Sequence, residues 1–461
     1  MFQGSGHLLA DELDHVGDSL AYHFSKTDEA AKAVQYLTRS AHKAAARNAD
    51  VEAVAALDLA LARIPELRPE AQDRLTLDTV LSLAGSLMNL GRFPTICDLL
   101  LAHEERIIRV ADPRITGLFR FQSALVWNFV GDNDRAQTYA RQALEASEQA
   151  GDAATMGKAH YVLALAGLWL GQPREVISHG TAAIKLLQGT EGRYWLGLAR
   201  WALGLNYAMV GRFEAALTEE ASAREIGVAM GSRRLTSYAD WARGAIQAFM
   251  GEPEQGIEAC RRSLEDSPDP FNTATALGFL GFAHLENDQP RDAVTHLERA
   301  IEAFRGFQYR HAEGLFTAYL SDAVYRSGDF SRARALATEW LKRDTSARFL
   351  YGVGLARRLL GRVAVAEGAL TDAAALLAQA QDVFVSIDAT HEVGRTHLAL
   401  AELTHALDDV EGCRAHAARA RALFQQLGAP RYVERTESMA IGWGVALPVE
   451  EGSTPSSGGH E

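Results

Sequence analysis

Evenly spaced turns constrain this chain more than any other feature of its sequence. Short polar or glycine turns recur with successive separations of 40 residues, except for one separation of 37. These turns lie at Gly91, Gly131, Gly171, Gly211, Gly251, Asp288, Gly328, Gly368 and Asp408. Such regularity is typical of repeat proteins, in which each unit packs only on its neighbours. We therefore expect the 461 residues to distribute their core along a stack of units instead of forming one globule.

Small side chains recur at fixed distances from these turns. They lie five residues after a turn, again seven residues further on, and also seven residues before the turn. Examples are Ala136, Ala216 and Ala293 for the first position, and Ala124, Gly204 and Gly281 for the last. Spacings of three, four and seven place such residues on one stripe of a helix. Because the side chains are small, we expect paired antiparallel helices to approach to the lower end of the usual range of about 8 to 10 Å.

The pattern resembles the tetratricopeptide repeat, in which W-x2-L-G-x2-Y is followed by A-x3-F. The resemblance is carried by Leu203-Gly204-x2-Tyr207 with Ala216, and by Ala293-x3-Leu297-x2-Ala300. HEAT and armadillo repeats also have periods of about 40 residues, but the fixed positions of the small residues favour the tetratricopeptide type. The resemblance implies an all-α fold, a right-handed α-α superhelix of tetratricopeptide type with repeats of about 40 residues.

The register of the turns divides the chain into five segments. We expect an N-terminal segment over residues 1–12, irregular repeats over 13–66, regular repeats over 67–428, a capping helix over 429–446 and a flexible tail over 447–461. The tail is predicted from its proline, glycine and serine content, which does not support a packed core.

The first repeats resemble a particular group of bacterial proteins. The group comprises signalling ATPases linked to class III adenylate cyclases, and maltose-activator-type regulators. The start of this chain is similar to the junction that leads into their C-terminal helical repeats. The similarity lies in the stretches Leu20-Ala-Tyr-His-Phe24, Lys32-Ala-Val-Gln-Tyr-Leu37 and Ala44-Ala-Ala-Arg-Asn48. The resemblance implies repeats that sense a ligand or partner and restrain an ATPase, so an ATPase or cyclase module is a possible partner. The chain has no GxxxxGK[ST] loop, and any ATP chemistry is expected elsewhere.

Composition limits the partners and the location. No apolar run approaches the roughly 20 residues of a membrane span, so no membrane partner is expected. The formal net charge of −13 disfavours direct binding of nucleic acid, which needs clustered lysine and arginine. Residues 1–7 lack a basic stretch followed by an apolar one, and we therefore expect a cytoplasmic protein.

Sequence motifs for catalysis, metal or cofactor binding are missing from the chain. GxSxG and HExxH do not occur, and the three cysteines, Cys97, Cys260 and Cys413, contain no CxxC pair. We expect buried reduced thiols. His391 and His397 are six residues apart on different helix faces, which favours solvated histidines over a zinc site. The protein is thus predicted to be no enzyme and to carry no cofactor and no metal.

Adjacent acids also favour a structural interpretation over a catalytic one. Glu219 with Glu220, and Asp408 with Asp409, could suggest general acid and base chemistry. Neighbouring residues on a helix do not face one another, so we expect both pairs to be solvated surface residues.

Aromatic residues provide the candidate binding surface. The position ten residues before the turn carries an aromatic ring in four successive units: Phe121, Tyr161, Trp201 and Trp241. Nearby in register are Phe129, Trp169, Phe249 and Phe282. Large rigid rings dominate binding hot spots, so one interpretation is a ladder along the concave groove that binds a peptide or a flat small ligand. The other is that longer helices tighten the superhelix and the rings fill its interior.

Arginines succeed the aromatic rings on the same face beyond Gly328. Arg326, Arg358, Arg362 and Arg395, with Arg357 beside them, fall on or near groove positions, and Asp322, Glu402 and His405 are interleaved. Guanidinium groups suit carboxylate or phosphate ligands, which would give the ligand an acidic end as well as an apolar one. Internal pairing with the acids is the alternative.

These patterns favour a non-catalytic protein-interaction or sensor scaffold that binds a peptide or partner protein in its concave groove, in signalling or regulation. The alternative is a small-ligand sensor domain of a signalling ATPase or transcription regulator. An enclosed pocket would favour the small ligand, and an open trough would favour the peptide. A glycosidase of the helical-toroid kind would need two inward carboxylates in one pocket, and the aromatic and arginine residues at groove positions disfavour it.

Overall fold

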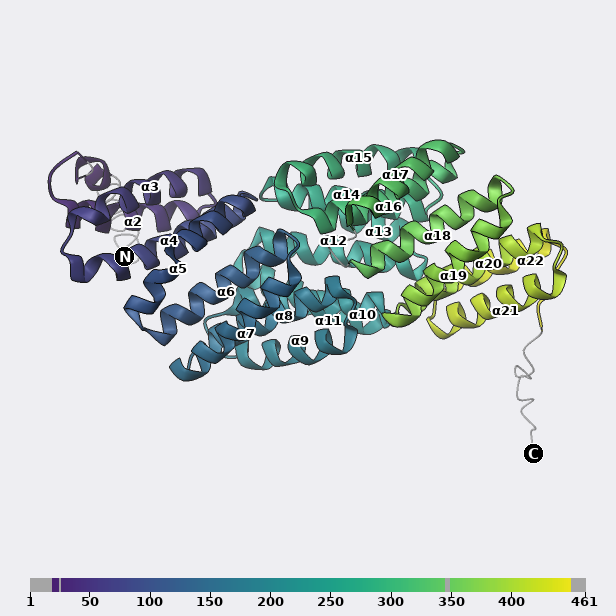
Figure 1. The fold of residues 1–461 in the computed structure, drawn as a ribbon, viewed down its shortest axis with the longest axis horizontal. Coiled ribbons are helices and arrows are strands. Elements are labelled where there is room, and N and C mark those ends of the chain that lie inside the picture. Colours follow the sequence, from purple (N-terminus) through teal and green to yellow (C-terminus); the bar gives the residue numbers. More distant parts are fainter. Residues whose placement is uncertain (1–18, 25, 345–348, 449–461) are drawn as a thin grey trace, which may run out of the picture.

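The computed structural model describes residues 19–24, 26–344 and 349–448, which form helices and no strand. Consecutive antiparallel helix pairs stack into a right-handed superhelix, so the predicted all-α fold of tetratricopeptide type with repeats of about 40 residues is confirmed (Figure 1). The predicted segment 1–12 and residues 449–461 of the predicted tail lie outside the described residues.

Each unit consists of a first helix and a second helix of similar length. The first helices are α2 (Ala30–Ala46), α4 (Pro69–Asn89), α6 (Pro113–Phe129), α8 (Ala153–Leu170), α10 (Arg193–Met209), α12 (Arg233–Met250), α14 (Pro270–Glu286), α16 (Arg310–Arg326), α18 (Leu350–Ala366) and α20 (Thr390–Ala406). The second helices are α3 (Asp50–Arg63), α5 (Phe93–Val110), α7 (Asn133–Ala150), α9 (Pro173–Leu187), α11 (Phe213–Met230), α13 (Pro253–Glu265), α15 (Pro290–Phe307), α17 (Phe330–Asp344), α19 (Leu370–Ser386) and α21 (Val410–Gln426). A short 3₁₀ helix, η1 (Ile64–Glu66), follows α3, and α22 (Pro430–Gly442) ends the stack.

The predicted turn residues end the first helices in a left-handed conformation. All of them have positive φ, from 52° at Asp288 to 90° at Gly131 and Gly328. Glycine adopts this region without a steric penalty, and aspartate tolerates it. Left-handed residues also end several second helices, among them Gly151 and Gly231. The turns predicted from the sequence are therefore confirmed.

The small residues bring the two helices of a unit into close contact, as predicted. A Cβ added at Gly244 would lie 2.5 Å from the Cys260 Sγ and 2.7 Å from the carbonyl oxygen of Gly256. A Cβ added at Gly281 would lie 2.6 Å from the Leu297 Cγ. Only a residue without a side chain fits at either position, because packed interiors leave no spare volume.

Successive turns of the superhelix touch one another. The Asn133 Nδ2 lies 3.1 Å from the His311 Nε2, although these residues are 178 positions apart. The Arg431 Nη1 lies 3.4 Å from the Glu254 carboxylate, across 177 positions. The start of α16 thus lies beside the turn between α6 and α7, and α22 lies beside the turn between α12 and α13 (Figure 1). These contacts join units that are far apart along the stack.

Two sequence predictions about polar side chains are wrong. Glu220 is only 1% exposed, because its carboxylate packs against Gly204 of α10, whereas the adjacent Glu219 stays partly exposed and accepts a hydrogen bond from Arg200. His391 is only 2% exposed and makes edge contacts with four rings where turns of the superhelix meet. By contrast, Asp408 and Asp409 are exposed, as expected.

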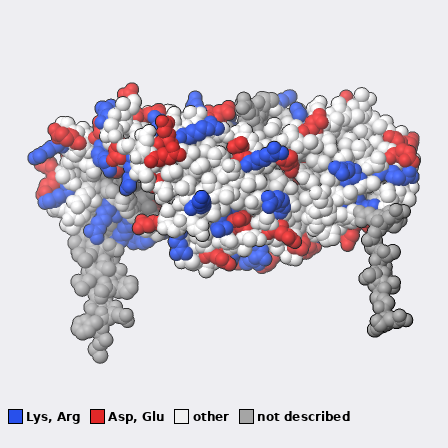
Figure 2. All heavy atoms as spheres, turned by 90° about the horizontal axis from the view of Figure 1, so that it is seen from below, with Lys and Arg blue, Asp and Glu red and all other residues white. Residues whose placement is uncertain are grey.

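The three thiols and the outer surface follow the sequence predictions more closely. Cys97, Cys260 and Cys413 are free and buried, and burial raises the pKa of the Cys97 thiol to about 11. None of the described helices is long and apolar enough to cross a membrane. Figure 2 shows basic and acidic side chains interspersed in small groups over one face.

Candidate binding site inside the superhelix

A cavity of about 530 Å³ opens among the first helices at the N-terminal end of the superhelix. We call it the mouth cavity; it lies between α2, α4, α6, α8, α10, α12 and the start of α14. Its volume falls within the range of about 300 to 1,000 Å³ typical of ligand sites. Its lining includes Gln122, Phe129, Tyr161, Tyr194, Trp195, Arg234, Tyr238, Asp269, Phe271 and Asn272.

Three tyrosines and an ion pair form the polar wall of the mouth cavity. The Arg234 Nε lies 2.9 Å from the Asp269 Oδ2, which leaves this pair electrically balanced. Burial raises the pKa of Tyr161, Tyr194 and Tyr238, so all three keep their hydroxyl protons at neutral pH. The wall therefore offers hydroxyl groups that both donate and accept hydrogen bonds.

One acceptor in this wall is fixed in orientation and unused. The Asn272 Nδ2 donates to the Asp269 Oδ2 at 2.9 Å, and a carboxylate cannot donate in return, so the Asn272 Oδ1 is an acceptor. This oxygen is buried and has no hydrogen-bond partner among the described residues. Asp269 also caps the start of α14, because its Oδ1 accepts a hydrogen bond from the backbone N–H of Asn272. This contact holds Asn272 in place.

A second unused acceptor and a cation lie near the same wall. The Gln122 Oε1 is also buried without a partner. The Lys158 Nζ lies 5.8 Å from the ring centroids of both Phe121 and Trp195. Burial lowers the pKa of Lys158, and the distant Asp152 offsets only part of this effect. This cation therefore lies against two rings and outside the lining of the cavity.

A narrower cavity of about 110 Å³ continues inward from the mouth. We call it the aromatic channel. It shares four lining rings with the mouth cavity: Phe129, Tyr161, Tyr238 and Phe271. Its other walls include Trp169, Trp201, Trp241, Phe249, Phe279, Tyr309, Phe316 and Phe349. The two cavities are therefore neighbours, with these four rings in the walls of both.

The structure brings six of the eight predicted aromatic residues to this channel. Phe129, Tyr161, Trp169, Trp201, Trp241 and Phe249 line it. The remaining two lie elsewhere: Phe121 contacts Trp195 edge to face at 5.0 Å, and Phe282 stacks on Tyr319 at 4.5 Å. Phe121, Tyr161, Trp201 and Trp241 are at most 7% exposed. The rings fill much of the interior and leave a slot between them.

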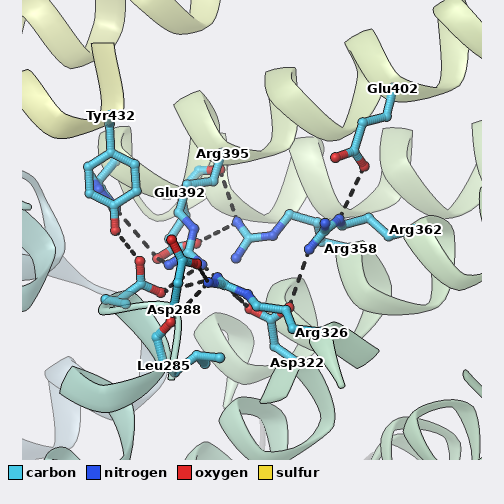
Figure 3. A network of polar contacts seen from close by, with 12 residues as sticks. Leu285, Asp288, Asp322, Arg326, Arg358, Arg362, Glu392, Arg395, Glu402 and Tyr432 are labelled. Carbon is cyan, nitrogen blue, oxygen red and sulfur yellow. Dashed lines mark hydrogen bonds and ion pairs between the residues drawn. The ribbon is translucent and has the colours of Figure 1, made fainter. Parts of the chain in front are cut away.

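The predicted arginines gather in a buried ion-pair network near the C-terminal end (Figure 3). Arg326 lies 3.1 Å from Asp322, and Arg395 lies 3.0 Å from Glu286. Arg362 lies 3.3 Å from Asp322 and 3.2 Å from Glu402. Further contacts join Arg358 to Glu392, and Tyr432 to Glu286. Arg326, Arg358, Arg362 and Arg395 therefore each have an internal acid as partner.

The electrostatics of this network keep its acids charged. Burial by itself would raise the pKa of Glu286, but Arg395 and Arg326 hold it below its usual value. Burial likewise opposes ionisation of Glu392, and Arg358 and Arg395 lower its pKa well below the ordinary range. Since Glu286 belongs to α14 while Arg395 belongs to α20, the network joins segments that are 109 positions apart.

Sequence analysis missed several residues of the mouth cavity. Tyr194 and Trp195 begin α10, and Tyr238 and Asn272 lie near the starts of α12 and α14. None of them lies at the ladder position ten residues before a turn; Trp195 and Asn272, for example, both lie sixteen residues before their turns. The adjacent large rings of Tyr194 and Trp195 were the available signal.

Comparisons with known proteins support the fold. No known family matches the chain, and no curated protein matches it. Among solved structures it is similar to a Rap protein complexed with Competence and Sporulation Factor, with 12% identity, coverage of 76% of this chain and 98% of that chain, and a TM-score of 0.58. A human IFIT1 dimer with m7Gppp-AAAA has 14% identity, coverage of 88% and 90%, and a TM-score of 0.48. At such low identity the likeness to the Rap protein shows the fold alone.

Proposed function

We propose that this protein is a non-catalytic binding scaffold that holds a short peptide, free or as part of a partner protein, in the mouth cavity. The observation that carries the proposal is the cavity of about 530 Å³ itself, whose wall combines aromatic rings with tyrosine hydroxyl groups and the Arg234–Asp269 ion pair. Peptide backbones supply amide donors and carbonyl acceptors side by side, which suits a wall of hydroxyl and amide groups. The Rap protein of similar fold was solved complexed with Competence and Sporulation Factor, a precedent for ligand binding by such a stack.

A small metabolite is the second candidate ligand. The cavity volume of about 530 Å³ favours it, since sites of this size typically hold small molecules. With a metabolite as its ligand, the protein is a sensor domain in signalling or regulation, acting in the cytoplasm. The N-terminal resemblance to repeats of signalling ATPases and maltose-activator-type regulators supports such a role.

The non-catalytic part of the proposal is supported by the acids near the mouth cavity. Asp269 pairs with Arg234 and also caps α14, so it is not free to act as a general base. Enzymes that rely on two carboxylates need both in one pocket. Asp269 is the only carboxylate among the described residues that line this cavity.

The test uses a pool of synthetic pentapeptides with randomised residues and a matched pair of variants. Trp195→Ala removes a partly exposed ring of the mouth cavity, while Trp127→Ala removes a ring that lines neither cavity. We expect wild type and Trp127→Ala to retain the same peptides, and Trp195→Ala to bind them at least about tenfold more weakly. Retention would be measured by affinity selection with mass spectrometry, and folding by circular dichroism. Equal retention by both variants, or none by wild type, would overturn the peptide proposal.

A further inference from the structure

A ligand confined to the mouth cavity would leave the aromatic channel empty. We propose that the ligand is a short peptide with an apolar terminal side chain, aromatic or branched, and that this side chain enters the aromatic channel. The inference rests on the proposed function, because it names the ligand class of the same site. The side chain would pass between the four rings that line both cavities: Phe129, Tyr161, Tyr238 and Phe271.

The size of the channel fits one side chain. Protein interiors are packed as densely as organic crystals, and an empty cavity destabilises the fold. A cavity of about 150 Å³ lined by apolar residues stays dry and binds benzene. The channel, at about 110 Å³ and lined almost wholly by rings and aliphatic groups, is close to this size. A single ring or branched chain would fill it.

The polar atoms of the channel also lack partners. The indole Nε1 atoms of Trp169, Trp201 and Trp241 are buried and have no acceptor among the described residues. Buried N–H groups without acceptors are rare in folded proteins and call for an explanation. Because these atoms are buried, the channel presents almost only ring and aliphatic surface to a guest, which suits an apolar side chain.

The rest of the ligand is constrained by the mouth cavity. Its wall presents tyrosine hydroxyl groups and the Arg234–Asp269 ion pair, and a backbone amide supplies both a donor and an acceptor for such groups. The hydroxyl groups of Tyr161 and Tyr238, beside the neck between the cavities, suit the carbonyl next to that amide. An amide followed by an apolar side chain is the chemistry of a peptide end.

The experiment compares pentapeptide pools that differ in one residue. Four positions are randomised, and the fifth, at either end, is fixed as phenylalanine or as serine. Wild type is expected to retain a phenylalanine pool at least tenfold more than the matching serine pool. Ala245→Leu fills the channel from α12 without touching the mouth cavity, since Ala245 lines only the channel. This variant should lose the preference for phenylalanine while it still retains serine-ended peptides.

Two further variants keep the result interpretable. Ala312→Leu fills the channel from α16 and replaces Ala245→Leu if that variant does not fold, as judged by circular dichroism. Ala303→Leu makes the same change outside both cavities and should keep the preference.

The outcomes separate the two proposals. If peptides bind and depend on Trp195, but wild type shows no preference for phenylalanine or Ala245→Leu leaves it unchanged, the channel inference is wrong and the proposed function stands. If no pool binds wild type, both are wrong.

Discussion

Glu220 places a carboxyl group at a core position of the repeat. Nine residues after the turn, other units carry small or apolar side chains. Glu220 is buried against Gly204, and neither of its carboxylate oxygens has a hydrogen-bond partner among the described residues. Burial raises the pKa of Glu220 well above its usual value, and the neighbouring Glu219 raises it further. The corresponding residues are Leu100, Ala140, Gly180, Cys260, Leu297, Ala337, Leu377 and Ala417.

Replacing Glu220 by the alanine of other units should stabilise the protein. At pH 7 we expect Glu220→Ala to raise the free energy of unfolding by about 1 to 3 kcal/mol, the usual penalty of a buried polar group without a partner. A raised pKa in the folded state means that wild type loses stability as pH rises from the unfolded value toward the folded one. The gain should therefore be smallest near pH 4 and increase toward pH 8. Urea unfolding at several pH values measures it.

Glu219→Ala is the control for that experiment. Glu219 accepts a hydrogen bond from Arg200 at 2.7 Å, so its removal should leave stability unchanged or slightly lower. A stability difference between Glu220→Ala and wild type that is the same at pH 4 and pH 8 would contradict the protonation of Glu220 in the fold.

At the scale of the helix pair, glycines in first helices serve two different purposes. Gly244 lies against the backbone of α13, where an added Cβ would meet the Gly256 oxygen at 2.7 Å. Gly85 lies within α4, where an added Cβ would meet nothing within 4 Å. Helix propensity favours alanine at both positions, but only Gly85 has room for it.

Alanine substitutions at these two glycines should therefore have opposite signs. Gly85→Ala is expected to stabilise the protein by about 0.5 to 1 kcal/mol, because it lowers the entropy of the unfolded chain. Gly244→Ala is expected to destabilise it by about 1 to 3 kcal/mol, since two helices must move apart. Chemical denaturation of both variants tests the pair. Stabilisation by Gly244→Ala would show that the helices of this unit are not held in close contact.

The helix pairs were predictable from the sequence because their causes are local. Left-handed turn residues such as Gly131 and close-packed residues such as Gly281 act within one unit of about 40 residues, so each unit repeats the same signal. Glu220 escaped prediction because its unit departs from the shared pattern at a single core position. From its polarity alone, such a residue is predicted to lie on the surface.

At the scale of the whole molecule, the pitch of the superhelix was not predictable. Pitch accumulates from a small rotation in every unit, and no single residue encodes it. The sequence identified Trp201 and Trp241 as inward rings, yet whether they line an open trough or an enclosed channel depends on contacts such as that between Asn133 and His311. The mouth cavity was missed for the same reason, because its wall is assembled by the curvature of many units.

Contacts between superhelical turns also explain why some turn residues are glycine. Gly251 and Gly328 have nearly equal φ values, 88° and 90°. An added Cβ at Gly251 would lie 2.8 Å from the Arg431 Cβ in α22, whereas one at Gly328 would meet nothing within 4 Å. Gly251 is therefore constrained by both its conformation and its neighbour, and Gly328 by its conformation only.

This difference allows the contact between turns to be tested separately from backbone strain. Gly328→Ala should lower the free energy of unfolding by about 1 kcal/mol, the usual cost of alanine in the left-handed region. Gly251→Ala carries the same strain and must also displace Arg431, which contacts Glu254 and Asn287 across the turns. It should cost more and should speed amide hydrogen exchange in α22, while exchange there stays at the wild-type rate in Gly328→Ala. Equal losses with unchanged exchange in α22 would mean that the turns of the superhelix do not press on one another in solution, and that the interior is open to longer ligands.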